Sequence, residues 1–97
     1  MQAKAPLEKT IVAKVVAQGR ALGYWVTKYH GSAFSMSGVP DVMLIKGGRV
    51  CWLECKRPGQ KPTPIQLLRM EELRAAGCPV AVVTSADEAR TFLESIA

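Results

Sequence analysis

The segment RVCWLECK, residues 49–56, constrains the fold more than any other part of the chain. Side chains alternate between the two faces of a strand, and here both alternating sets are largely apolar. This pattern is typical of a strand at the centre of a sheet. The segment nevertheless ends in Glu54 and Lys56, and burying either charge is costly unless it is paired or bound to a metal. The sequence therefore predicts a central strand whose end carries chemistry.

A second strand, Asp41–Lys46, precedes this one and is joined to it through Gly47-Gly48, which predicts a hairpin. A two-residue turn there places Asp41 directly opposite Glu54 on the same face, with Cβ atoms about 4.5–5.5 Å apart. Two carboxylates so placed repel each other, and a divalent cation such as Mg²⁺ removes that penalty. A bulge or a three-residue loop would break this register. An ordinary ion pair between Glu54 and Lys56 is the alternative interpretation of the strand end.

Lys56 follows Glu54 by two residues, so the two side chains share a face and lie about 6.5–7 Å apart along the strand. Its ammonium group could there hold an attacking water or stabilise charge that develops on a phosphate. Asp41, Glu54 and Lys56 together favour a metal-binding functional site over a purely structural role.

The remaining pattern predicts a single α/β domain with the element order α-β-β-β-α-β-α. Thr63, Pro64 and Gln66 have the spacing of a helix N-terminus with a capping box. A helix between the third and fourth strands favours a parallel pairing of those strands, and hence a mixed four-stranded sheet flanked by helices. The expected segments are helix 7–22, strands 24–29, 41–46 and 49–56, helix 64–76, a buried strand 80–84, and a last helix after Ser85.

Composition limits the partners and the compartment. The net charge of +5 and the pI near 9.4 favour a polyanionic partner, although a merely solvated basic surface fits the charge equally well. No apolar run is long enough for a membrane span or a signal peptide, so we expect a cytoplasmic location without membrane contact. The three cysteines lack zinc spacing and are expected to be reduced packing residues, and Trp25 and Trp52 are expected in the core.

The motif Gly38-x-Pro40-Asp41, followed after twelve residues by Glu54-x-Lys56, resembles the signature of the PD-(D/E)xK nucleases. The surrounding pattern resembles their VRR-NUC branch, the virus-type replication-repair nucleases. The resemblance runs from about Glu8 to the last helix and implies one nuclease domain over residues 1–97 with a restriction-endonuclease-like core.

The resemblance also implies a site. Asp41, Glu54 and the backbone carbonyl of Cys55 would bind Mg²⁺ or Mn²⁺, and Lys56 would orient the nucleophilic water. Glu8 would join the metal site directly or through water, and Gln66 would be a further catalytic residue. Each of these two has a structural alternative, because the helix dipole favours an acid in a first turn and Gln66 completes a capping box.

The function that the resemblance implies is metal-dependent, structure-selective cleavage of DNA in repair or recombination. A homodimeric enzyme acting on Holliday junctions, in a bacterial or a virus-infected host cell, is the first expectation. Flap or nicked-duplex cleavage, non-specific cleavage, and a non-catalytic DNA-binding module are the alternatives. Basic and serine side chains near the predicted site are candidate DNA contacts: Lys46, Arg49, Arg57, Lys61, Arg69, Ser35 and Ser37.

Overall fold

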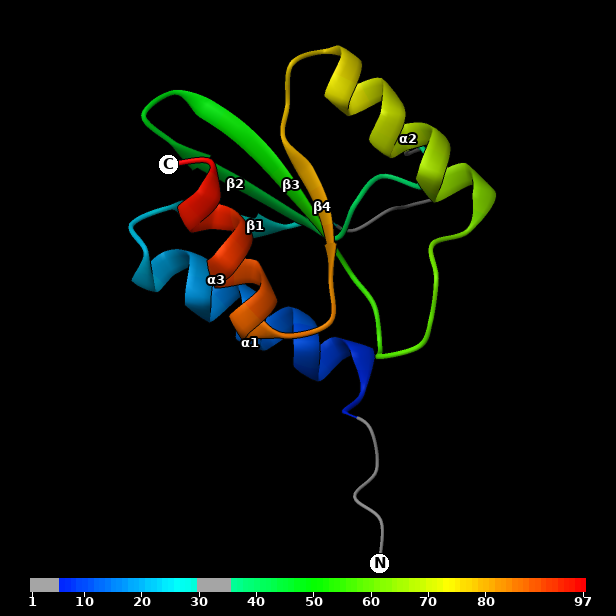
Figure 1. Ribbon diagram of the computed structural model, residues 1–97, viewed down its shortest axis with the longest axis horizontal. Coiled ribbons are helices and arrows are strands. Elements are labelled where there is room, and N and C mark those ends of the chain that lie inside the picture. Colours follow the sequence, from blue (N-terminus) through cyan, green and yellow to red (C-terminus); the bar gives the residue numbers. More distant parts are fainter. Residues whose placement is uncertain (1–5, 30–35) are drawn as a thin grey trace, which may run out of the picture.

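The computed structural model describes residues 6–29 and 36–97, and its element order is the predicted one (Figure 1). Within these two ranges no helix is both long enough and apolar enough to cross a bilayer. The elements are α1 (Glu8–Ala21), β1 (Trp25–Lys28), β2 (Val42–Lys46), β3 (Arg49–Cys55), α2 (Pro64–Ala75), β4 (Val80–Val83) and α3 (Ala86–Ser95).

The strands form one mixed sheet in the order β1-β2-β3-β4. The first three are antiparallel neighbours, whereas β3 and β4 are parallel and are connected through α2, as predicted. Gly47 and Gly48 both have positive φ angles, 58° and 78°, which the tightest hairpin turns require. The predicted central strand is β3, and it does lie between two neighbours. The prediction of a fully buried last strand was wrong, because β4 is an edge strand on which Val82 is 38% exposed.

Helices α1 and α3 pack together on one side of the sheet, and α2 lies on the other side (Figure 1). The core lies under α1 and α3, where Ile11, Val15 and Leu93 meet Leu44 and Leu53 from the central strands. The other face of the sheet is only partly covered. Trp25 is 59% exposed there, so its predicted place in the core was wrong, and Trp52 is half-buried with its ring edge against Tyr29. The cysteines are free thiols, as expected.

The N-terminus of α2 is built as the sequence predicts. Thr63 is the N-cap, and its hydroxyl accepts a hydrogen bond from the backbone N–H of Gln66. The side-chain oxygen of Gln66 in turn accepts one from the backbone N–H of Thr63, which completes the capping box. Pro64 occupies the first helical position, where its missing N–H costs nothing.

The segment before Asp41 is fixed against this helix. Gly38 has a φ angle of 81°, and a Cβ on it would lie 2.8 Å from the carbonyl oxygen of Ile65. Arg69 of α2 donates from Nε to the Ser37 carbonyl over 2.8 Å. Gly38 therefore packs closely against α2, and this contact couples α2 to the chain that leads into Asp41.

Replacing Gly38 by Ala should destabilise the fold by more than backbone strain alone. Gly59 is a matched control, since its φ angle is 86° and a Cβ on it would meet no atom within 4 Å. A residue in this left-handed region costs about 1–2 kcal/mol at either site, and crowding against Ile65 should add roughly 1–3 kcal/mol for Gly38→Ala. Urea denaturation measures how much each variant lowers the free energy of unfolding. An equal decrease for Gly38→Ala and Gly59→Ala would contradict the close packing at Gly38.

Candidate active site

The hairpin register places two acids opposite each other. The pairs run from Lys46–Arg49 to Val42–Leu53, and one further step opposes Asp41 to Glu54, as the sequence predicted. Glu8 in the first turn of α1 joins them from the helical layer. One carboxylate oxygen from each of Glu8, Asp41 and Glu54 lies within 4.8 Å of the other two. Residues 8, 41 and 54, far apart in the sequence, thus form one acidic cluster.

Glu54 is the most constrained member of this cluster. It is 1% exposed, and no hydrogen-bond donor in residues 6–29 and 36–97 reaches either of its carboxylate oxygens. Burial raises the pKa of Glu54 to about 9, and a proton shared with Asp41 and the negative charge of Asp41 act in the same direction. The positive charge of Lys56 lowers this pKa but does not offset the burial. An ionised Glu54 therefore needs a cation that the side chains alone do not supply.

Asp41 is held by the ends of both neighbouring strands. Its Oδ2 accepts a hydrogen bond of 2.9 Å from the backbone N–H of Cys55, and its carbonyl accepts one of 2.7 Å from the N–H of Tyr29. The carboxylate is thereby turned toward the end of β3, where Glu54 lies. One carboxylate oxygen of Asp41 thus accepts a backbone hydrogen bond, and the carboxylate retains lone pairs that can bind a metal.

The backbone carbonyl of Cys55 has no hydrogen-bonding partner in the ladder of the described strands. The N–H of Lys56 points to β4, where it donates to the Val83 carbonyl, so the N–H and C=O of Cys55 point the other way, toward β2. Continuing the register opposes Cys55 to Pro40, which has no N–H to donate. A free carbonyl beside Asp41 is a suitable hard ligand, and together with the acids it fits a divalent cation.

Lys56 lies at the edge of the cluster. Its side chain is 12% exposed, and its ammonium nitrogen is 3.9 Å from Oε1 of Glu8. The alternative ion pair between Glu54 and Lys56 is not formed among the described residues, because Lys56 pairs with Glu8 and no donor reaches Glu54. The cluster thus combines one cation with three acids. This arrangement leaves a net negative charge for a metal to neutralise.

Comparison with known proteins agrees with this geometry. No family model matches the sequence. A curated relative named "Putative nuclease p44", from Acyrthosiphon pisum secondary endosymbiont phage 1, is 36% identical over 81 residues, which are 82% of this chain and 85% of that protein. A solved structure named "VRR_NUC domain" is 30% identical with a TM-score of 0.76, covering 90% of this chain and 94% of the other.

The chain belongs to the VRR-NUC family. A second solved structure, named "VRR_NUC domain protein", is 19% identical with a TM-score of 0.75 over 94% of this chain and 88% of its own, and shows that the fold is shared. The mixed four-stranded sheet and the order α-β-β-β-α-β-α are those of the VRR-NUC nuclease fold.

In this VRR-NUC protein, the side-chain oxygen of Gln66 accepts from the N–H of Thr63, so its capping role is present. Its catalytic role stays a prediction. Arg69 donates to the Ser37 carbonyl and to Glu72, which places two of the predicted DNA contacts against each other. Arg57 directly follows Lys56, at the end of β3 that carries Glu54. Lys61 is exposed in the following loop. Ser35 lies outside the described residues.

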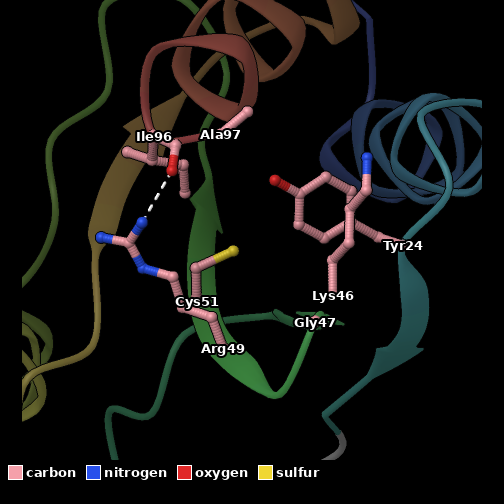
Figure 2. A pocket seen from close by; sticks show the side chains of 7 residues that line it. All are labelled: Tyr24, Lys46, Gly47, Arg49, Cys51, Ile96 and Ala97. Atoms are coloured by element: carbon pink, nitrogen blue, oxygen red, sulfur yellow. Dashed lines mark hydrogen bonds between the residues drawn. The ribbon is translucent and has the colours of Figure 1, made fainter.

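The expected position of Lys46 and Arg49 near the acids was wrong. Both lie at the turn of the β2–β3 hairpin, five residues from Asp41 and Glu54, which is about 17 Å along each strand. Figure 2 shows them in a separate pocket with Tyr24 and Ile96. Lys46 lies over the Tyr24 ring and donates to the Leu22 carbonyl, while Arg49 donates to the Ile96 carbonyl over 2.6 Å.

Two lysines beside Asp41 were missed. A cavity of about 190 Å³ is lined by Lys9, Val12, Lys28, Tyr29 and Asp41. Lys9 could have been noted because it follows Glu8 directly. Lys28 depends on the pairing of β1 with β2, which the sequence leaves open across the long connection between them.

The buried carboxylate predicts a pH dependence of stability. Because the folded pKa of Glu54, about 9, exceeds its ordinary value of 4.5, the unfolded chain releases this proton first as the pH rises. The corresponding stability is present below pH 4.5 and is lost as the pH rises toward about 9. We expect the Tm in EDTA to fall between about pH 5 and about pH 8.

The variant Glu54→Gln, which stays neutral, should flatten this fall, whereas Glu71→Gln at an exposed position should leave it unchanged. Added Mn²⁺ should raise the Tm of the wild type at the higher pH and have little effect on Glu54→Gln. Scanning fluorimetry measures each Tm. A Glu54→Gln protein that loses stability as steeply as the wild type would show that this carboxyl is not the cause.

Proposed function

We propose that this VRR-NUC protein is a metal-dependent DNA endonuclease. The observation that carries the proposal is the buried, unpartnered carboxylate of Glu54, which meets Asp41 and Glu8 at the end of two strands. The relative named as a phage nuclease supports the same reaction class. A cluster of this kind is costly to the metal-free fold and useful once a cation is bound, as expected for a functional site rather than a structural one.

The metal site consists of Asp41, Glu54 and the Cys55 carbonyl, with Glu8 bound directly or through water. A set of oxygen ligands alone suits Mg²⁺ or Mn²⁺ better than zinc or copper. When bound there, the cation would polarise the scissile phosphate and lower the pKa of a bound water. Lys56 orients the attacking water and stabilises the charge that develops on the phosphate oxygens. Attack at phosphorus forms the new P–O bond, and the bond to the departing nucleoside oxygen breaks with protonation of that oxygen.

The substrate we propose is branched DNA, with the four-way junction first, cleaved by a homodimer. Two sites related by a two-fold axis match a symmetric junction. Helix α2 supports a second copy as partner, because it exposes three large apolar side chains to solvent: Ile65, Leu67 and Leu68. Light scattering should give twice the 10.5 kDa chain mass, and a strictly monomeric mass would exclude this form. The phage origin of the relative supports action in the cytoplasm of a bacterium.

Cleavage assays test the proposal directly. The protein should cut labelled four-way DNA with Mg²⁺ or Mn²⁺ and should not cut in EDTA. Asp41→Ala and Lys56→Ala should each lower the cleavage rate by about 100-fold or more, because the first removes a ligand of the metal and the second removes the positive charge that acts on the reacting phosphate. Arg90→Ala, on the exposed side of α3, is the control and should cut at the wild-type rate.

The choice of substrate separates the remaining functions. Equal cutting of flap, nicked, linear and four-way DNA would indicate a non-specific nuclease, and preference for flap or nicked duplex would replace the junction as substrate. Metal-independent binding with no cutting of any substrate would contradict the nuclease and indicate a binding module. A Lys56→Ala protein that cuts as fast as the wild type would remove Lys56 from the mechanism.

A further inference from the structure

A groove between α1 and β1 begins at the acidic cluster. Its first part is the cavity beside Asp41, to which Lys9, Val12, Lys28 and Tyr29 contribute. A second cavity, of about 370 Å³, continues from Lys28 and is lined by Ala13, Val16, Arg20, Thr27 and Lys28. The two cavities share Lys28, and we call them together the α1–β1 groove.

One side of α1 forms the wall of this groove. The wall begins at Lys9. Three, four, seven and eleven positions after Lys9 follow Val12, Ala13, Val16 and Arg20, a spacing that places all five residues along one helix face. The distance from Lys9 to Arg20 is about 16 Å along the helix axis. The groove thus leads away from the metal site over a length that spans more than one phosphate of a DNA strand.

Apart from Asp41 at its active-site end, the charged residues that line the groove are all basic. Residues 9–29 contain Lys9, Lys14, Arg20 and Lys28 and no acidic residue. Within the part of the chain that the structure describes, Lys9, Arg20 and Lys28 form no salt bridge, in contrast to Arg69 and Arg90. Arg20 donates one hydrogen bond to the Val26 carbonyl over 3.3 Å, which leaves further guanidinium donors available.

The uncharged part of the lining indicates what is recognised. Val12, Ala13 and Val16 offer neither hydrogen-bonding side chains for base edges nor rings on which bases could stack, and the Thr27 hydroxyl donates to the Lys28 carbonyl. Tyr29 is the aromatic residue of the groove and lies at its active-site end. Cations on apolar walls fit a phosphate backbone and provide no means of reading a sequence.

We infer that the α1–β1 groove binds the phosphate backbone of the DNA strand on one side of the cleaved bond, through Lys9, Lys28 and Arg20. This inference rests on the proposed nuclease function for the identity of the ligand. It adds the path of the strand and three contacts that are independent of base sequence. A strand whose reacting phosphate lies at Asp41 and Glu54 would meet Lys9 and Lys28 first and Arg20 last.

Binding measured without metal separates this inference from catalysis. Fluorescence anisotropy with labelled four-way DNA in EDTA should give a Kd about tenfold higher for Lys9→Gln/Lys28→Gln than for the wild type near 0.1 M salt. The slope of log K against log[salt] should become shallower by roughly 1.5, since each lost phosphate contact removes about 0.7–0.9. Lys9→Arg/Lys28→Arg should restore both values.

The control is Lys14→Gln/Arg90→Gln, which removes the same charge from outside the groove. Lys14 lies about 140° around α1 from Lys9 and borders a different cavity, with Thr84 and Asp87. This control should bind within about twofold of the wild type, because unspecific surface charges contribute little at this salt concentration. Circular dichroism and Tm values confirm that all variants are folded.

The outcomes distinguish the two proposals. If the wild type cuts DNA but Lys9→Gln/Lys28→Gln binds it as tightly and with the same salt slope, DNA binding in the groove is contradicted and the nuclease proposal is unaffected. If no DNA is cut with any metal, yet only Lys9→Gln/Lys28→Gln loses binding, DNA binding in the groove is supported and the nuclease proposal is contradicted. An equal loss in the control variant, or a wild type that does not bind DNA, overturns the groove.

Discussion

The carboxylate of Glu54 is placed by the same strand pairing that builds the core. On β3, Leu53 and Cys55 face the packed layer under α1 and α3, so Glu54 between them points to the opposite face. That face is closed around Glu54 as well, and no donor in the described ranges reaches its oxygens. Lys56 stabilises the charge of this side chain only in part, so an ionised Glu54 calls for a further cation bound at the active site.

The end of β2 prepares the place for that ion. Pro40 stands where the next residue of the ladder would donate to Cys55, and its missing N–H leaves the Cys55 carbonyl free. The N–H of Cys55, which points toward β2 as well, donates to the side chain of Asp41. Pro40 and Asp41 thus end the pairing of β2 with β3, and the same two residues set the orientation of the Asp41 carboxylate. Gly38, packed against α2, fixes the segment that leads into it.

The sequence predicted those parts of the site that depend on local rules. Two glycines between β-type runs fix a hairpin register, and this register alone opposed Asp41 to Glu54. The capping box of Thr63 and Gln66 follows from spacing in the same way, and the structure shows that Gln66 is used there. Glu8 joined the cluster through the family resemblance and the packing of α1, since no local rule connects residue 8 with residue 41.

The predictions that were wrong concern residues whose positions depend on tertiary packing. Alternation along a strand does not say which face of the sheet is covered, and for this reason Trp25 was placed in the core although it is exposed. Lys46 and Arg49 were grouped with the acids because they share strands with them, yet a separation of five residues along a strand is about 17 Å. Lys28 approaches Asp41 only through the pairing of β1 with β2, which spans a long connection.

The central claim is that Glu8, Asp41 and Glu54 bind one divalent cation. The most direct measurement is the anomalous difference density of a crystal grown or soaked with Mn²⁺, recorded together with a Glu54→Gln crystal treated in the same way. We expect a single strong peak among the three carboxylates in the wild type and none in Glu54→Gln. A wild-type crystal with no peak there, or with its manganese bound elsewhere, would contradict it.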